Sequence, residues 1–294
     1  MKPLGSYQNG NYRVTIFDDG TKIRANDLDN LMPYKPESMD ILITKQCSGT
    51  NCAYCHEDAR PGGQHGDILD IPFLDTLLPC TELAIGGGNP LSHPQLVPFL
   101  HQCKNRNLIA NMTVHQHHFC ENIDKIRRLT SEGLLHGIGV SVVEANKETM
   151  YWFRKVPNAV VHVINGVIDM GQLHKLYDHG LKLLILGYKD FRRGVPAHTP
   201  ETDRRMKALY AELPELTRHF KVVSFDNLAI KQLDPKRLLS EEEWNEFYMG
   251  DDGQYTMYVD MVNREFAKSS TSTERWPLMD DIKPMFDKVR GATL

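Results

Sequence analysis

The sequence lacks any long apolar run, and this absence excludes several classes of protein. No stretch is long enough to cross a bilayer as a helix, and the N-terminal residues hold no apolar core of a signal peptide. Neither sign of charge is in large excess: the net charge is −4 and the pI is about 6.3, which argues against general nucleic-acid binding. We therefore expect a soluble, cytoplasmic protein without a membrane partner.

Cysteine is also scarce, with six in 294 residues and none after Cys120. Such a chain does not carry the cysteine pattern of a disulfide framework, and a reducing compartment fits it best. Three of the six cysteines, however, fall within nine residues: Cys47, Cys52 and Cys55. Three thiolates this close in sequence can converge on one soft metal centre, and three ligands leave a coordination position open. The triplet therefore predicts a cofactor that takes part in chemistry.

Short apolar runs alternate with amphipathic helical patterns from residue 38 to about residue 230. Continuous Val, Ile and Leu runs are typical of parallel strands covered on both faces, and this repeated alternation predicts βα units in an open sheet or a barrel. The expected strands are Asp40–Thr44, Glu82–Ile85, Leu108–Val114, Gly137–Val143, Val160–Ile164, Lys182–Leu186 and Lys221–Phe225.

The two ends of the chain follow other patterns. Residues 11–26 hold two alternating runs around Asp18-Asp19-Gly20, which predicts a hairpin. Residues 254–262 predict a further strand in a C-terminal segment that we expect to pack as a cap. The expected organisation is an N-terminal extension over residues 1–37, a core over 38–232 and a cap over 233–294.

Polar and glycine residues collect where the expected strands end. The cysteine triplet follows the first strand, and Gly86-Gly87-Gly88-Asn89 follows the second. Three successive glycines let a ligand approach the backbone closely. In parallel α/β folds, sites lie at these carboxyl ends, so we expect one site there.

These motifs resemble those of the radical S-adenosylmethionine (SAM) enzymes. In that family a three-cysteine loop after the first core strand binds a [4Fe–4S] cluster, and the residue before the last cysteine is aromatic, as is Tyr54 here. A Gly-Gly-Glu-Pro-type motif after the second strand binds the SAM amino group. The resemblance implies a partial (β/α)6 barrel with the N-terminal hairpin and small C-terminal cap described above.

The resemblance also implies site residues. Cys47, Cys52 and Cys55 would hold the cluster, and the SAM-binding residues would be Tyr54, Gly86, Gly87, Gly88, Asn89, Ser141, Ile164 and Gly166. Two features depart from the family pattern. The first cysteine gap has four residues rather than three, and Gly88 or Asn89 stands where the family has a carboxylate.

The activity implied by this resemblance is reductive cleavage of SAM at the cluster to give a 5′-deoxyadenosyl radical that acts on a substrate. A reductant such as flavodoxin or ferredoxin would supply the electron. The sequence leaves the substrate open as a small molecule, a nucleotide or a peptide. The candidate lining residues are His65, His115, His162, Tyr188, Lys189, Arg192, Arg193 and Asp226.

Two alternatives remain open at this level. The cysteine triplet with His56 could be a Cys3His zinc site in a binding or regulatory protein without redox chemistry. Separately, His115, His117, His118 and Cys120 could form a second metal site, although histidines on a polar loop more often face solvent or substrate.

Overall fold

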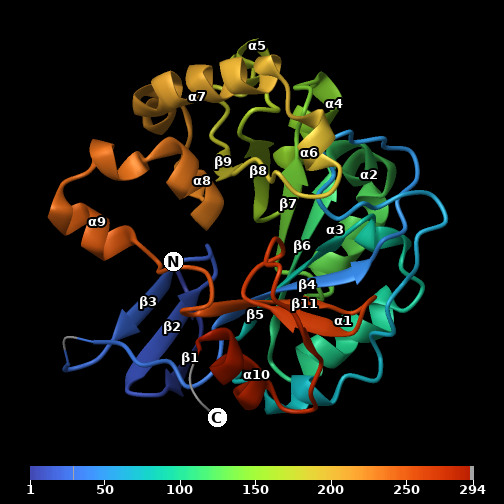
Figure 1. Cartoon of the computed structure of the whole chain (residues 1–294), viewed down its shortest axis with the longest axis vertical. Helices are drawn as coiled ribbons and strands as arrows, with labels where there is room; N and C mark the ends of the chain where they lie inside the picture. The colour runs from blue at the N-terminus through green and yellow to red at the C-terminus, as the bar shows by residue number, and fades with distance from the viewer. Residues whose placement is uncertain (29, 292–294) are drawn as a thin grey trace.

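The seven expected apolar runs all form strands, and they lie side by side in chain order within one sheet (Figure 1). The computed structural model describes residues 1–28 and 30–291. The parallel strands are β4 (Ser38–Thr44), β5 (Glu82–Gly87), β6 (Ile109–His115), β7 (Gly137–Ser141), β8 (Ala159–Ile164), β9 (Lys182–Leu186) and β10 (Val222–Phe225).

Helices follow most of these strands and cover the outer side of the curved sheet (Figure 1). The α-helices are α1 (Leu96–Asn105), α2 (Gln116–Glu121), α3 (Ile123–Ser131), α4 (Lys147–Phe153), α5 (Met170–His174), α6 (Gly194–Ala197), α7 (Pro200–His219), α8 (Asn227–Leu233), α9 (Glu241–Phe247) and α10 (Ile282–Val289). Short 3-10 turns η1 to η3 cover Pro72–Thr76, Pro90–Ser92 and Pro235–Leu238. No helix in these described residues is long and apolar enough to cross a membrane.

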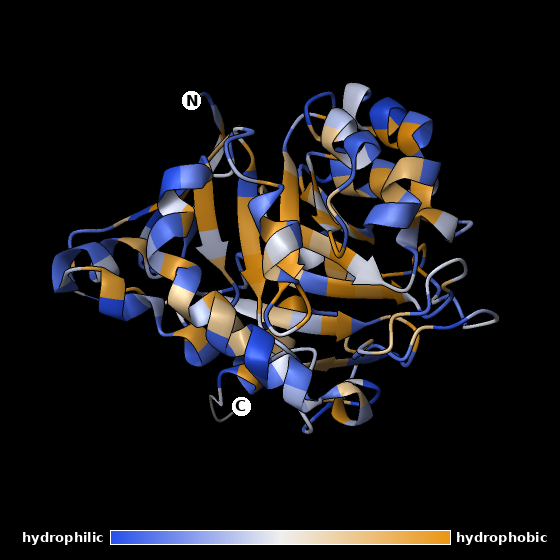
Figure 2. Cartoon of the chain, turned by 90° about the horizontal axis from the view of Figure 1, so that it is seen from above, coloured by the Kyte–Doolittle hydropathy of each residue, from blue (hydrophilic) through white to orange (hydrophobic). Residues whose placement is uncertain are grey.

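Strand alternation divides the interior into two sides. In β6, for example, Met112 and Val114 are fully buried, whereas Thr113 and His115 are only half-buried. The buried set packs into the main hydrophobic core beneath the helices, and Figure 2 shows the apolar strands inside a more polar helical surface. The alternate side chains point to the inner face of the sheet, as the two-residue period of a strand requires.

The C-terminal segment extends the main sheet. Strand β11 (Thr256–Asp260) pairs with β4 in parallel, and β12 (Glu265–Ala267) and β13 (Trp276–Pro277) follow as antiparallel strands. The ten strands thus run from β10 at one edge to β13 at the other. This is a large, mostly parallel open sheet, and its strand pairing does not single out the six βα units of the expected barrel.

The N-terminal segment forms a separate antiparallel sheet of three strands, one more than the expected hairpin. Strand β1 (Pro3–Asn9) pairs with β2 (Tyr12–Phe17), which pairs with β3 (Lys22–Ala25). Sequence reasoning missed β1 because it holds a proline and a glycine, and Tyr7 is its one buried apolar side chain.

A fully buried carboxylate fastens this small sheet to the core. Glu37 accepts hydrogen bonds from the Tyr12 hydroxyl at 2.5 Å and from Arg24 Nε at 2.8 Å. Lys22 Nζ lies 3.5 Å from Glu37 and 2.8 Å from Glu82 of β5. Opposite charges and a hydroxyl surround Glu37, so removing its carboxylate leaves buried groups without partners.

Replacing Glu37 with alanine should lower the free energy of unfolding by about 3–5 kcal/mol, the usual effect of breaking a buried ion pair on one side. Urea denaturation measures this change. Asp75→Ala is the matched control, because its pair with Arg106 is exposed at the surface and should contribute at most about 1 kcal/mol. Equal effects of the two variants would contradict the role assigned to Glu37.

Candidate active site

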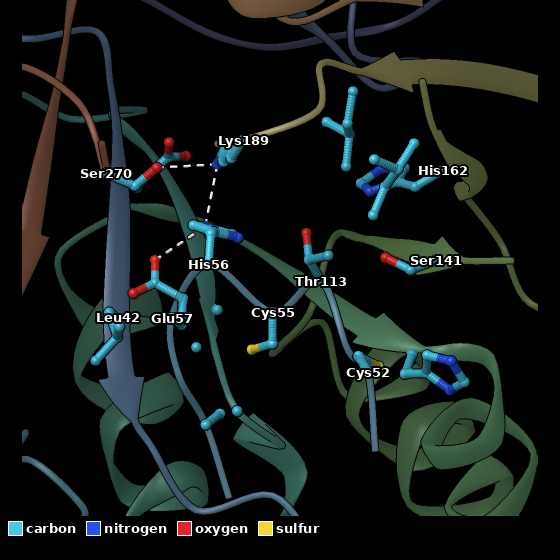
Figure 3. Close-up of a pocket in the computed structure, with 18 of the residues that line it drawn as sticks. Leu42, Cys52, Cys55, His56, Glu57, Thr113, Ser141, His162, Lys189 and Ser270 are labelled. Carbon is cyan, nitrogen blue, oxygen red and sulfur yellow. Dashed lines mark hydrogen bonds and ion pairs between the residues drawn. The ribbon is translucent and has the colours of Figure 1, made fainter. Parts of the chain in front are cut away.

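A cavity of about 410 Å³ lies on the inner face of the sheet, at the carboxyl ends of the parallel strands. Alternate residues of neighbouring strands line it, so the register of the sheet sets its walls. The lining residues from strands include Asp40, Leu42, Ala84, Thr113, His115, Ser141, His162, Ile164, Leu184 and Leu186. Figure 3 shows several of these side chains converging from different strands.

The three clustered cysteines all face this cavity. They are free thiols on the loop that leaves β4. Backbone hydrogen bonds close the loop on itself: the Cys47 N–H donates to the Arg60 carbonyl at 3.0 Å, and the Arg60 N–H donates to the Lys45 carbonyl at 3.0 Å. The loop therefore returns to its own starting point and presents its sulfurs inward.

Two arginines from the segment after β9 hold the far side of the same loop. Arg193 donates to the Ala59 carbonyl at 2.6 Å, and Arg192 lies 3.3 Å from the buried Glu57 carboxylate. Neither arginine lines the cavity. The expectation that these two arginines contact a substrate is therefore wrong. Both side chains support the cysteine loop instead.

The thiols provide a donor set suited to a soft metal centre. Burial raises the pKa of both Cys47 and Cys52, and the Thr50 hydroxyl, 3.1 Å from Cys47 Sγ, opposes that rise. Within residues 1–28 and 30–291, one group of three His, Cys, Asp or Glu donors comes within 4.8 Å of one another, and it is not this triplet. At least one pair of the three sulfurs is therefore more than 4.8 Å apart.

The glycine run beside the cysteines behaves differently at each position. Gly86 has open space where a Cβ would stand, and Gly86, Gly87 and Gly88 all line the cavity. Gly87 has φ +114, and a Cβ there would stand 2.2 Å from the Thr44 carbonyl oxygen. Gly87 is therefore required by its backbone conformation and by the nearby Thr44 carbonyl. Gly86, in contrast, leaves space in the cavity.

The five other residues expected at the SAM site divide into two groups. Ser141 and Ile164 line the cavity, as does Tyr54. Asn89 and Gly166 do not. The Asn89 side chain accepts from the Leu91 N–H and caps the η2 turn. A Cβ on Gly166 would meet Thr202 and Met206 on the helix side, so its positive φ serves the turn after β8.

The candidate substrate-lining residues divide in a similar way. His115, His162, Tyr188, Lys189 and Asp226 line the cavity, and His65 does not. His65 instead pairs with the Thr44 hydroxyl at 2.8 Å. Asp226 accepts from the Gly187 and Ala229 N–H groups, so its carboxylate also caps α8.

Three polar residues, His56, Glu57 and Ser270, form a cluster next to Lys189 that sequence reasoning missed. Its ammonium lies 2.9 Å from Ser270 Oγ and 3.1 Å from His56 Nε2, and the same ring nitrogen lies 3.1 Å from Glu57 (Figure 3). One imidazole nitrogen can serve only one of these partners at a time. His56 and Glu57 directly follow the last cysteine, a signal available in the sequence, whereas Ser270 comes from a distant loop.

Burial in the cavity wall shifts the pKa of several lining side chains. Burial lowers the pKa of His115 and of His162 to about 4, so both rings are neutral at pH 7. Burial also raises the pKa of Asp40 to about 6, with Lys189 opposing the shift and Asp226 adding to it. The Asp40 side chain is exposed to solvent, which reaches it from the cavity.

The second metal site that the sequence left open does not bring together all four of its residues. His115 caps α2 by accepting from the His117 N–H at 3.2 Å, and Cys120 faces Thr149 of α4 at 3.5 Å. His117 and His118 come together instead with Glu121.

Asp40→Asn should stabilise the protein at pH 7.5 and have little effect below about pH 4. A carboxyl whose folded pKa is raised opposes folding once it ionises, so the wild type loses stability as pH rises from about 4 through about 6. The gain should be at most about 1 kcal/mol, because solvent in the cavity screens the charge. Thermal melts across this range measure it, and a gain that is the same at every pH would contradict the shift.

Comparison with known proteins places the fold but not a family. No family model matches the chain, and no curated protein matches it. Among solved structures, Streptococcus suis SuiB bound to its precursor peptide SuiA has a TM-score of 0.56 at 11% identity, covering 88% of this chain and 67% of that one. SuiB bound to S-adenosylmethionine has a TM-score of 0.54 at 11% identity, covering 88% and 64%. This chain therefore shares its fold with SuiB and spans about two thirds of SuiB's length.

Proposed function

We propose that this protein is a radical SAM enzyme, with Cys47, Cys52 and Cys55 holding a [4Fe–4S] cluster. The observation that carries the proposal is the convergence of the cysteine loop and the Gly86–Gly88 run on one cavity at the carboxyl ends of the strands. The shared fold with SuiB, which binds S-adenosylmethionine, supports it. When bound, the cluster would supply the electron that cleaves SAM to a 5′-deoxyadenosyl radical.

The spacing of the sulfurs favours a cluster over the alternative of a structural zinc ion. Three thiolates on one zinc ion would lie about 3.8 Å apart, given Zn–S bonds of about 2.3 Å in a tetrahedron. The three cysteines do not gather within 4.8 Å of one another. At least one pair of sulfurs would have to move closer to hold zinc, whereas a [4Fe–4S] core accommodates a wider donor set.

Within the cavity we assign the two ligands to different sides. Gly86, Ser141 and Ile164 would contact SAM, with Gly86 leaving room next to the cysteines. The substrate would face Lys189, His56 and Ser270. Neutral His115 and His162 would line the cavity without adding charge. Among the substrate classes left open, the precursor peptide bound by SuiB supports a peptide.

The protein itself would hold these groups apart from bulk water. Arg192 and Arg193 hold the cysteine loop in place beside the cavity, and Tyr258, which lines the cavity, donates to Glu57. Keeping the loop in place would shield the 5′-deoxyadenosyl radical from water and oxygen. A flavodoxin or ferredoxin would deliver the electron at the exposed side of the loop.

Anaerobically prepared protein should hold about four irons and four sulfides per chain. The triple variant with Cys47, Cys52 and Cys55 changed to alanine should lose the iron and the brown colour while remaining folded. Iron and sulfide analysis with circular dichroism tests this. Cys103→Ala is the control, since Cys103 is a fully buried core thiol. Colourless protein with stoichiometric zinc would instead establish the alternative function.

Gly86→Val should weaken SAM binding by about tenfold or more, comparable to the 1–3 kcal/mol that overpacking a filled site costs. Its thermal stability should change little, because the added carbon meets open space. Calorimetry on the cluster-loaded protein measures the affinity. Gly87→Val should behave in the opposite manner, with a large fall in Tm from the clash with Thr44. Unchanged SAM affinity in Gly86→Val would place SAM elsewhere.

A further inference from the structure

We propose that His117, His118 and Glu121 form a binding site for a single zinc ion beside the cysteine loop. Their donor atoms all lie within 4.8 Å of one another. Two imidazoles and a carboxylate are an established zinc donor set, and three protein ligands leave a fourth position for water. The site is separate from the cysteine triplet, so it does not depend on the function proposed above.

The donor spacing suits one tetrahedral ion. His117 Nε2 lies 3.1 Å from Glu121 Oε1, and His118 Nδ1 lies 3.7 Å from Glu121 Oε2. Ligands on one zinc ion lie about 3.3 Å apart, given bonds of about 2.0–2.1 Å. The two distances end on different oxygens of Glu121, whose half-exposed side chain is free to rotate and turn either oxygen toward the ion.

His118 provides a second and independent observation. It is 1% exposed, and its Nδ1 is buried without a hydrogen-bond partner in the described part of the chain. A buried polar atom without a partner destabilises a fold by about 1–3 kcal/mol. A metal ion between Nδ1 and Glu121 would satisfy this nitrogen, whereas the 3.7 Å gap is too long for a hydrogen bond.

The simpler interpretation is a pair of surface contacts along one helix. His174 of α5 and Glu212 of α7 show an ordinary histidine–carboxylate contact, with one histidine nitrogen 2.9 Å from one carboxylate oxygen. The α2 cluster differs because a second imidazole, almost fully buried, directs a free nitrogen at the same carboxylate. One histidine and one carboxylate can share a proton, but they do not form a three-donor site.

The site touches the cysteine loop at two points. The other nitrogen of His118, Nε2, lies 3.5 Å from Cys47 Sγ. Gly49 has φ +84 and leaves room for the His117 ring, since a Cβ there would stand 2.6 Å from Nε2. Zinc on His118 Nδ1 would leave the proton on Nε2, where it donates to the sulfur. The ion would thereby fix the first cysteine of the loop, a consequence that rests on the proposed function.

The test uses the full-length variant with Cys47, Cys52 and Cys55 changed to alanine, so that thiols cannot take the added metal. Calorimetry with Zn²⁺ should give one ion per chain, and Co²⁺ should give the visible absorption of a tetrahedral site. His117→Ala and Glu121→Ala should each weaken binding by about tenfold or more. Both side chains are partly exposed, so neither change should unfold the protein.

His174→Ala in the same background is the matched control and should leave zinc binding unchanged. Saturating zinc should also raise Tm, by linkage, in the parent but not in the His117 or Glu121 variants. If the triple variant does not fold, the same titrations on the cluster-loaded protein answer the question. Absence of zinc binding in the parent, or unchanged binding in both variants, would overturn the site. If the unmutated protein binds no iron while the triple variant still binds zinc, only the proposed function is overturned.

Discussion

The parallel register of β4 to β10 is the constraint on which the cavity depends. Because the strands run in the same direction and in chain order, their carboxyl ends meet at one edge. Because side chains alternate, Thr113, Ser141 and His162 reach the inner face from three neighbouring strands. Gly139 is part of this arrangement, since a Cβ there would stand 2.0 Å from the His162 ring. The lining is thus fixed by pairing before any ligand is present.

The sequence predicted the seven core strands because long Val, Ile and Leu runs have few alternatives to a buried strand. It did not predict β1, whose composition is polar, or the pairing of β11 with β4, which joins residues more than two hundred positions apart. Non-local strand pairing leaves little local signal.

In the candidate site, too, features with a local sequence signal were predicted and features that depend on distant contacts were not. Motif spacing was enough to bring the cysteines and Gly86 to the cavity, because each follows a strand end. It failed at Asn89 and Gly166, since a residue one or two positions beyond a strand can turn away to cap or close the loop. Ser270 could not have been found, because its approach to Lys189 depends on how the C-terminal strands join the sheet.

The cysteine loop contacts α2 within the gap between Cys47 and Cys52. Gly49 lies against His117 there, and only a residue without a side chain fits at φ +84. The loop is then held from three directions: by its own backbone at Arg60, by Arg193 at Ala59, and by His118 at Cys47. The loop therefore contacts α2 through Cys47 and Gly49, while all three cysteines line the cavity.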